Sequence, residues 1–212
     1  MFGDPVRNPK GWEVKRLGEL GILKNGMNYS QNDNGFSVRC LGVGDFGSLY
    51  EIHGVATCSE ISLSAKPATD YLLRNNDIVF VRSNGNRALV GRSVEVFPGK
   101  KELTFSGFCI RYRNEAPNLV TTYLNHALHL PSLRTALLKD GRGANIQNVN
   151  QQMLSALRIP LPPLVLQTRF ADFVRQVDKS KFIIQRSVDK LREEAKMCEF
   201  YGIMWVKSSA IM

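Results

Sequence analysis

The side chains best suited to recognition lie in one polar segment, residues 82–92. This segment follows an apolar run, residues 78–81, that is predicted to be a buried strand. An arginine guanidinium presents a planar fork that fits guanine or phosphate, and an asparagine amide fits adenine. Such residues are also common in loops merely because loops are solvated, so composition leaves both interpretations open. With the basic turn that follows, the candidate DNA-binding set is Arg82, Asn84, Asn86, Arg87, Arg92, Lys100 and Lys101.

No catalytic motif accompanies this segment. No glycine-rich loop is followed by Lys-Ser or Lys-Thr, and the glycines at 42 and 44 are too few to indicate a dinucleotide site. A DNA amino-methyltransferase needs a motif such as Asn-Pro-Pro-Tyr, whereas residues 161–164 read Leu-Pro-Pro-Leu and offer no amide or carboxylate. No carboxylate cluster with a lysine suits metal-dependent cleavage of DNA. We therefore expect a protein that binds rather than catalyses and that uses no cofactor.

Metal and disulfide patterns are also missing from the sequence. His126 and His129 have a spacing that could hold a metal on a helix, but no third ligand accompanies them. The four cysteines, Cys40, Cys58, Cys109 and Cys198, form no Cys-x-x-Cys pair, which predicts reduced thiols. The N-terminus has no leader pattern, and no apolar run is long enough to span a bilayer. We expect a cytoplasmic protein without a membrane partner.

The charge balance predicts a polyanionic partner. The 212 residues include 28 Lys and Arg against 19 Asp and Glu, which gives a net charge of +9 and a pI near 9.6. Such a balance favours nucleic acid over an acidic small molecule. The excess is concentrated in residues 74–113, with 8 basic and 3 acidic groups, whereas residues 1–73 carry 7 and 8. The length allows one domain of about 150 residues plus one appendage.

Hydrophobic patterning predicts an α+β fold, mostly β at first and helical later. Residues 12–20 suggest a short strand or turn that leads into a one-turn helix. Strands are expected at residues 36–43, 49–55, 78–81, 88–97 and 104–112. The first two would form a hairpin around the Asp45-Phe46-Gly47-Ser48 turn. The spacing of apolar residues then changes to a helical period, which predicts helices at 119–130, 131–139 and 149–157, with a loop at 141–145.

A proline-rich strap and one long helical pattern end the chain. Residues 159–163 read Ile-Pro-Leu-Pro-Pro, and since proline fixes φ and lacks an N–H group, this strap should be extended. From 164 to about 200 a heptad pattern predicts one helix of roughly 50 Å, followed by a tail at 201–212. Its apolar seam comprises Leu166, Phe170, Phe173, Val177, Ile184, Val188 and Leu191, with small residues between and one slip after Ile184.

Two interpretations of this helix remain open. It could fold back on its own domain, or it could pair with a second helix as a spacer or dimerisation element. Charges of alternating sign from Arg169 to Glu194 fit a solvated or paired coiled-coil helix, and a helix of this length outruns a small core. Because the chain contains one copy of the seam, we expect a homodimer. Antiparallel helices would place one basic domain at each end of the pair.

Several segments together resemble one half of a type I restriction-modification DNA specificity subunit, the HsdS family. They are Gly11-Trp12, residues 17–20, residues 76–83 and Ser106-Gly107-Phe108. The most specific part runs from Gly143-Ala144-Asn145-Ile146 through the proline strap and Gln167 into the long helix. The resemblance covers residues 11 to about 196.

The resemblance implies a target recognition domain, residues 1–158, that reads one half of a split site on double-stranded DNA. The helix would separate two such domains and dock the methyltransferase (modification) subunits, with the restriction subunit joining through the complex. Full-length members have two recognition domains and two helices. This chain contains one recognition domain and one helix. Three explanations fit: a truncated gene, an isolated fragment, or a natural half-subunit that pairs with itself or with another half-subunit. Family members differ at their DNA-contacting positions, so the resemblance assigns no numbered residue.

Other classes of protein stay open at the level of the sequence. A coiled-coil scaffold would keep the long helix but would have no use for the basic middle segment. A stand-alone DNA-binding protein would use that segment without restriction-modification partners. A nuclease or methyltransferase would need a catalytic motif that the sequence does not show.

Overall fold

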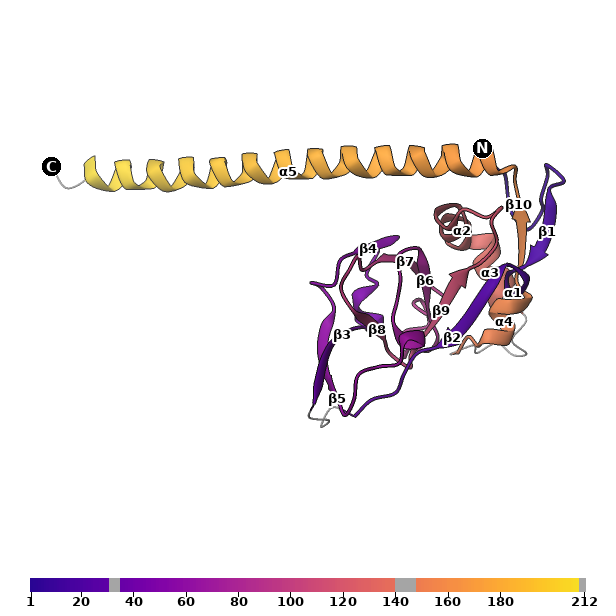
Figure 1. Ribbon diagram of the computed structural model, residues 1–212. Coiled ribbons are helices and arrows are strands. Elements are labelled where there is room, and N and C mark those ends of the chain that lie inside the picture. Colours follow the sequence, from indigo (N-terminus) through magenta and orange to yellow (C-terminus); the bar gives the residue numbers. More distant parts are fainter. Residues whose placement is uncertain (31–34, 140–147, 210–212) are drawn as a thin grey trace. The chain divides into compact units, whose positions relative to one another are not determined.

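The computed structural model describes residues 1–30, 35–139 and 148–209 and divides the chain into two compact units, Met1–Thr168 and Arg169–Met212. The N-terminal unit is a domain of β-strands with short helices (Figure 1). One helix, α5 (Leu164–Ser209), begins in the N-terminal unit and continues as the C-terminal unit. The predicted α+β class with a long terminal helix is therefore confirmed.

Two sheets form the body of the N-terminal unit. The five-stranded sheet has the order β2-β9-β6-β7-β4, in which only β4 and β7 pair in parallel. The three-stranded sheet has the order β5-β3-β8, in which β3 is antiparallel to β5 and parallel to β8. Their strands are β2 (Gly21–Asn25), β3 (Phe36–Leu41), β4 (Glu51–His53), β5 (Ser59–Leu63), β6 (Asp77–Val81), β7 (Ser93–Phe97), β8 (Leu103–Phe105) and β9 (Cys109–Asn114).

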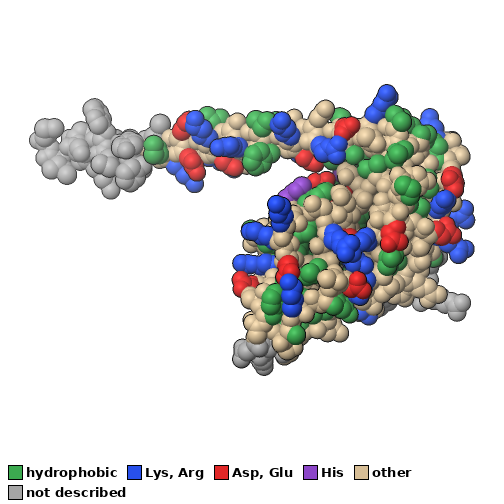
Figure 2. All heavy atoms as spheres, in the orientation of Figure 1, with side chains coloured by type: hydrophobic (Ala, Val, Ile, Leu, Met, Phe, Trp, Pro, Cys, Tyr) green, Lys and Arg blue, Asp and Glu red, His purple; other side chains and the backbone are tan. Residues whose placement is uncertain are grey.

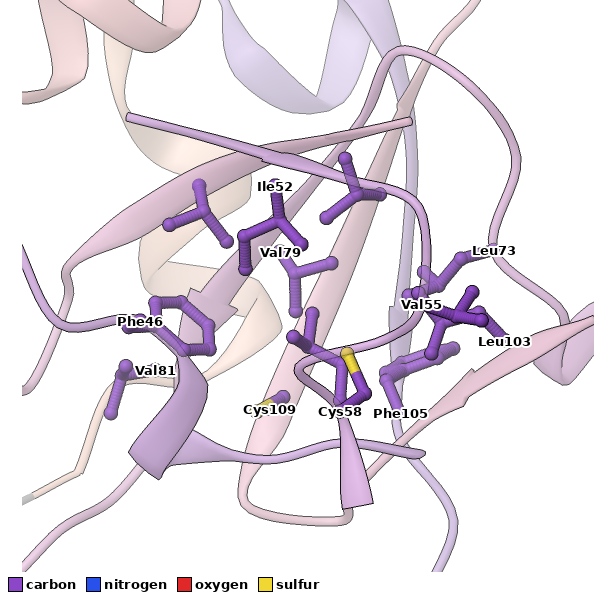
Figure 3. Close-up of a cluster of buried hydrophobic side chains, with 13 residues drawn as sticks. Phe46, Ile52, Val55, Cys58, Leu73, Val79, Val81, Leu103, Phe105 and Cys109 are labelled. Carbon is purple, nitrogen blue, oxygen red and sulfur yellow. The ribbon is translucent and has the colours of Figure 1, made fainter. Parts of the chain in front are cut away.

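The hydrophobic core draws side chains from both sheets. Val79 of β6, Val94 of β7 and Phe105 of β8 belong to one buried cluster with Phe46 from the loop after β3 (Figure 3). β6 is buried at all five positions, as the apolar run at 78–81 predicts. It pairs with β7 and β9, and its Val79 and Val81 side chains belong to the core cluster. Each large side chain buried in this way stabilises the fold by about 1.5–3 kcal/mol.

The short helices lie close to their predicted positions. They are α1 (Leu17–Leu20), α2 (Thr121–Leu128), α3 (Pro131–Lys139) and α4 (Gln151–Ala156). Pro131 opens α3, where its missing N–H group costs no hydrogen bond. Asn150 caps α4, because its side chain accepts the Met153 N–H group at 2.8 Å. The loop predicted at 141–145 lies outside the described residues.

The proline strap is extended, as predicted, and forms a strand. β10 (Arg158–Leu161) pairs antiparallel with β1 (Glu13–Arg16), so that Pro160 stands opposite Val14 in a ribbon of two strands. Each strand of such a ribbon has an edge that no other strand uses, which allows proline there. The Tyr123 hydroxyl donates to the Pro160 carbonyl at 3.0 Å and fastens the ribbon to α2.

A buried glutamine fixes the junction between the strap and α5. The Gln167 amide oxygen accepts the Val120 N–H group at 2.9 Å. Its amide nitrogen donates to the carbonyls of Pro162 at 2.7 Å and Asn118 at 3.0 Å. The side chain is fully buried, and three hydrogen bonds satisfy it there. The first turn of α5 is therefore part of the N-terminal domain.

The predicted hairpin of residues 36–43 and 49–55 is wrong. β3 and β4 lie in different sheets, β3 between β5 and β8 and β4 at the edge beside β7. A 3-10 turn (Val43–Asp45) carries the chain between them, and the Asp45 carboxylate caps it by accepting the Gly42 N–H group at 2.7 Å. Periodicity indicates which residues are extended, but it does not indicate their partners.

Two predicted strands have different bounds. The strand expected at 88–97 begins at Ser93, because Gly91 adopts a φ of +77° in a turn that closes on Val81. The strand expected at 104–112 is two strands, β8 and β9, in different sheets, with a turn at residues 106–108 between them.

The long helix was expected to end near residue 200, with a tail at 201–212, but it continues to Ser209. Gly202 does not stop it, since one glycine inside a helix costs only about 1 kcal/mol. Residues 210–212 lie outside the described part of the chain.

Candidate DNA interface

A groove opens at one edge of the domain, where four loop segments meet. β2 and β6 end there and β9 begins there, because Asn25 pairs with Ile110 and Val81 with Cys109. The groove has a volume of about 790 Å³. We call it the loop groove, and its lining residues are Met27, Asn28, Tyr29, Gly42, Val43, Ser83, Asn84, Gly85, Ser106, Gly107 and Phe108.

The turn between β8 and β9 forms the centre of the groove and is held from three sides. The Gly107 N–H group donates to the Met27 carbonyl at 2.7 Å, after β2. The Ser106 N–H group donates to the Leu41 carbonyl of β3 at 3.0 Å, and the Arg82 N–H group donates to the Phe108 carbonyl at 2.8 Å. These bonds fix the backbone of residues 106–108 against both sheets.

Phe108 stands out of this turn with 62% of its surface exposed. Because it also lines the groove, its apolar ring is open to a ligand there. Tyr29 forms another part of the wall, and its hydroxyl lies beside the Cys40 thiol. Burial, with the neighbouring thiol, raises the pKa of Tyr29. The groove therefore combines aromatic surface with asparagine amides.

The predicted recognition loop, residues 82–92, joins β6 to β7 and borders the groove. Its backbone closes at the base, where Val81 N–H donates to the Arg92 carbonyl at 2.8 Å and Gly91 N–H to the Val81 carbonyl at 2.9 Å. The Asn84 side chain accepts Asn86 N–H at 2.8 Å, and the Asn86 side chain accepts Ala88 N–H at 3.0 Å. Both asparagines thus help to shape the loop, and only Asn84 of the two lines the groove.

The arginines of this loop occupy different environments. Arg87 is exposed, whereas Arg82 and Arg92 are half-buried. The Arg82 guanidinium donates to the Gly107 carbonyl at 3.4 Å, a long bond that links it to the central turn. Arg87 is the cation of the loop that is most open to a phosphate.

Lys100 and Lys101 are not brought near this loop. They are exposed in the turn after β7, whereas residues 82–92 precede β7, so the strand separates the two groups by about 14 Å along its axis. Residues 100 and 101 therefore lie beyond the end of β7 that is farther from the loop groove.

Two arginines that contribute to the basic excess of residues 74–113 are structural. Arg113 forms a bidentate ion pair with the buried Asp77. Arg111 is only 4% exposed, and its guanidinium donates to the Asp70 carbonyl at 3.2 Å. Burial, reinforced by the charge of Arg113, lowers the pKa of Arg111. The surface excess is thus smaller than the sequence suggests.

The histidines and cysteines of the domain have structural surroundings. The rings of His126 and His129 stack on Tyr50, with centroids 4.6 and 4.0 Å away. Among the described residues no group of His, Cys, Asp and Glu side chains could hold a metal ion. Cys40, Cys58 and Cys109 are buried free thiols, and burial raises the pKa of Cys58 to about 11. The side chain of Cys198 is outside the described structure.

Asn28, Tyr29 and Phe108 were not predicted as site residues. Asn28 and Tyr29 lie between the elements predicted at 12–20 and 36–43, and Phe108 lies inside the strand predicted at 104–112. A useful signal was present, because Ser106-Gly107-Phe108 interrupts the apolar pattern with a small polar residue and a glycine. Their proximity depends on strand pairing, which the sequence pattern does not specify.

Apolar side chains of the predicted seam are exposed along α5. Phe173, Ile184 and Leu191 are 58%, 62% and 64% exposed, and Val177 and Val188 are half-buried. Acidic and basic side chains lie between the hydrophobic ones (Figure 2), and Asp172–Arg175 is one of several ion pairs within the helix. Phe182 and Ile183 are also exposed but lie off the seam at about 100° per residue. Within the described residues no helix is long and apolar enough to cross a membrane.

Comparison with known proteins places the chain in a family. Residues 9–192 match the family model described as the type I restriction modification DNA specificity domain. The chain is 31% identical over 176 residues to the type I restriction enzyme StySPI specificity subunit of Salmonella potsdam, an alignment that covers 80% of this chain and 36% of that protein. It is 26% identical to the putative type I restriction enzyme MjaX specificity subunit of Methanocaldococcus jannaschii, over 89% of this chain and 44% of that protein.

Solved structures share the fold. One, from work on complex assembly and conformational transition of the type I R-M system, matches with a TM-score of 0.58 and 21% identity, over 90% of this chain and 44% of that chain. The HsdS subunit from Thermoanaerobacter tengcongensis matches with a TM-score of 0.53 and 23% identity, over 84% and 40%.

The match of the family model covers most of the chain, and the fold and the grooved domain agree with it. The chain belongs to the family of type I restriction-modification DNA specificity domains. It spans less than half the length of the specificity subunits named above.

Proposed function

We propose that this chain is a DNA-recognising half of a type I specificity subunit, which reads one half of a bipartite site on double-stranded DNA. The observation that carries the proposal is the family match over residues 9–192, which includes the grooved domain and much of α5. A coiled-coil scaffold is less well supported, because it would give no reason for a rigid polar groove at the edge of the domain.

The DNA face, in this proposal, is the sheet edge that carries the loop groove and residues 82–92. Arg87 and Arg82 would contact phosphates beside the groove, since guanidinium groups bind phosphate oxygens without regard to sequence. Asn84 would face the bases from within the groove, and Asn86 and Arg92 would hold the loop in shape. Lys100 and Lys101 would act only if the duplex extended to that farther end of β7.

The chain itself would have no catalytic turnover. It would position a methyltransferase (modification) subunit that supplies the cofactor site, and the restriction subunit would join through that complex. Support comes from the relatives, which are specificity subunits by name, and from the sequence, which contains no methyltransferase motif.

The seam of α5 would pair two chains. Leu166, Phe170 and Phe173 begin this seam, and Ile184 and Leu191 further along it are exposed. An exposed apolar stripe of this length is costly in water and is covered when two helices form a coiled coil. A homodimer with antiparallel helices would present the same reading surface twice, so its half-sites would be inverted copies. A different half-subunit as the partner would give unlike halves.

Two measurements on the purified chain test the proposal. Its affinity for a random-sequence duplex should fall steeply as salt rises, because each phosphate contact releases counterions. It should also co-purify with a type I modification subunit when the two are expressed together. Binding that ignores salt, or no binding to DNA, would contradict the DNA-recognition role. Methyl transfer to DNA by the chain alone would show that an active site exists.

A further inference from the structure

The lining of the loop groove differs in chemistry from the loop beside it. Among the described residues that line the groove none carries a charge, whereas Arg82 and Arg87 lie in the adjoining loop. The bidentate guanidinium that most often reads guanine is therefore missing from this lining. What the lining offers instead is the amides of Asn28 and Asn84 and the exposed ring of Phe108.

These three side chains come from three separate segments and are brought together by backbone hydrogen bonds. Asn28 follows β2, Asn84 follows β6, and Phe108 lies in the turn before β9. The Gly107 N–H group binds the Met27 carbonyl, and the Phe108 carbonyl accepts the Arg82 N–H group. These bonds, at 2.7 and 2.8 Å, hold the backbone of the turn against the segments that follow β2 and β6, so the three side chains start from neighbouring points of one fixed scaffold.

The asparagine amides have capacity left for a ligand. Within the described part of the chain the Asn28 side chain makes no hydrogen bond. The Asn84 oxygen accepts one N–H group, from Asn86, and an amide oxygen has two lone pairs. Its amide nitrogen is not used by the loop. An amide that both donates and accepts matches the N7 acceptor and the N6 donor of adenine in the major groove.

Phe108 supplies the complementary contact. Thymine differs from cytosine in the major groove by its 5-methyl group, which an apolar side chain can cover. An exposed phenyl ring and two amides that line one groove offer groups for both bases of one A·T pair.

We propose that the loop groove selects an A·T base pair, with Asn28 or Asn84 bound to the adenine edge and Phe108 against the thymine methyl group. The inference rests on the proposed DNA-binding role and adds the base pair that this chain prefers. It also separates two tasks, because the neighbouring arginines supply affinity and the uncharged groove supplies selection.

The probe is a pool of duplexes with 20 random base pairs, prepared once with thymine and once with uracil, which lacks the 5-methyl group. The full-length chain should enrich A·T at one or more fixed positions of the thymine pool. Uracil at the selected position should weaken binding about fourfold, which is the worth of one buried methyl group. Phe108→Ala should remove this difference between thymine and uracil.

Variants of the amides complete the design. Asn28→Ala and Asn84→Ala should each be compared with wild type, and at least one should reduce the preference for A·T about tenfold. Gly107→Ala should also lower the preference, because a Cβ atom there would lie 2.0 Å from the Asn28 amide oxygen and push that side chain away. Matched controls are Asn118→Ala and Ile22→Ala, which change an exposed asparagine and an exposed apolar residue away from the groove edge.

The possible outcomes separate this inference from the proposed function. Salt-dependent binding with enrichment of G·C, or with an A·T preference that none of the groove variants changes, would overturn the inference and leave the DNA-binding role standing. Absence of any salt-dependent binding by the wild-type chain would overturn both. Two results together support the inference: Phe108→Ala abolishes the preference for thymine over uracil, and at least one amide variant reduces the preference for A·T, both at an unchanged salt slope.

Discussion

The Arg113 guanidinium donates two hydrogen bonds to the Asp77 carboxylate, from Nε to Oδ1 and from Nη2 to Oδ2, both of 2.7 Å. Asp77 is 1% exposed and also accepts the Arg74 N–H group at 2.7 Å. The pair joins the start of β6 to the end of β9, at the ends of these strands that lie away from the loop groove. Arg113 therefore contributes to stability rather than to DNA binding.

Asp77→Ala should lower the free energy of unfolding by about 3 kcal/mol, because it leaves the largely buried Arg113 without its counter-ion. Urea denaturation measures this change. Asp70→Ala is the control, since Asp70 pairs with Lys24 at the surface and its loss should leave the midpoint almost unchanged. Equal effects of the two substitutions would contradict the assignment of Asp77 and Arg113 as a structural pair.

Replacement of Arg82 and Arg87 together by Ala should reduce the slope of log affinity against log salt by up to about 2, since each phosphate contact contributes about 0.9. Arg82 also holds the turn at Gly107, so Arg87→Ala alone should remove about one contact without a change in the groove. Lys100→Ala with Lys101→Ala is the matched pair at the other end of β7 and should change the slope less. A folded Arg82/Arg87 double variant with wild-type binding would remove this loop from the DNA face.

Glu95 predicts a pH dependence of stability. It is fully buried on β7. Burial raises its pKa to about 7, and the nearby charge of Glu51 acts in the same direction, whereas the Thr122 side chain beside the carboxylate opposes the shift. The folded state thus binds a proton more tightly than the unfolded chain, where the pKa is 4.5. The stability that protonation gives is present below pH 4.5 and is lost as the pH rises to about 7, by about 3 kcal/mol in total.

Glu95→Gln keeps the shape of the side chain and removes this titration. The variant should match wild type near pH 4 and be more stable than wild type at pH 8, when unfolding is followed by urea at each pH. If the free energy of unfolding changed with pH in the same way for both proteins over this pH range, Glu95 would not titrate there.

Phe173→Asp combined with Ile184→Asp should yield monomers in sedimentation equilibrium, because both side chains lie on the exposed seam of α5. Phe182→Asp is the control, since Phe182 is also exposed but lies on the other side of the helix. It should remain paired. If Phe182→Asp produced monomers and the seam double variant did not, the helix would pair through the face that carries Phe182 and not through the seam.

The sequence predicted the elements of this fold better than their connections. The apolar run at 78–81 is the central strand β6, and the prolines of 159–163 mark the extended strap, because burial and fixed φ angles are local properties. The supposed hairpin failed because β3 and β4 pair with strands far along the chain. Asn28, Asn84 and Phe108 share one groove for the same reason, so long-range pairing and not composition defines the site.

Composition predicts a polyanionic partner but not where that partner would bind. Arg111 and Arg113 counted toward the basic segment, although both are held inside the domain. Lys100 and Lys101 are near residues 82–92 in sequence and far from them in space. A charge count cannot distinguish a cation that pairs with a buried carboxylate from one that faces solvent.

The most direct test of the central claim is to map methylated bases by single-molecule sequencing of DNA from cells that express this chain with a type I modification subunit. The account predicts methylation at an interrupted palindrome, with two inverted half-sites separated by an unread spacer, and no such methylation when either protein is expressed alone. A site with unlike halves would show that a second, different half-subunit completes the complex. Methylation that does not depend on this chain would contradict its role as the specificity component.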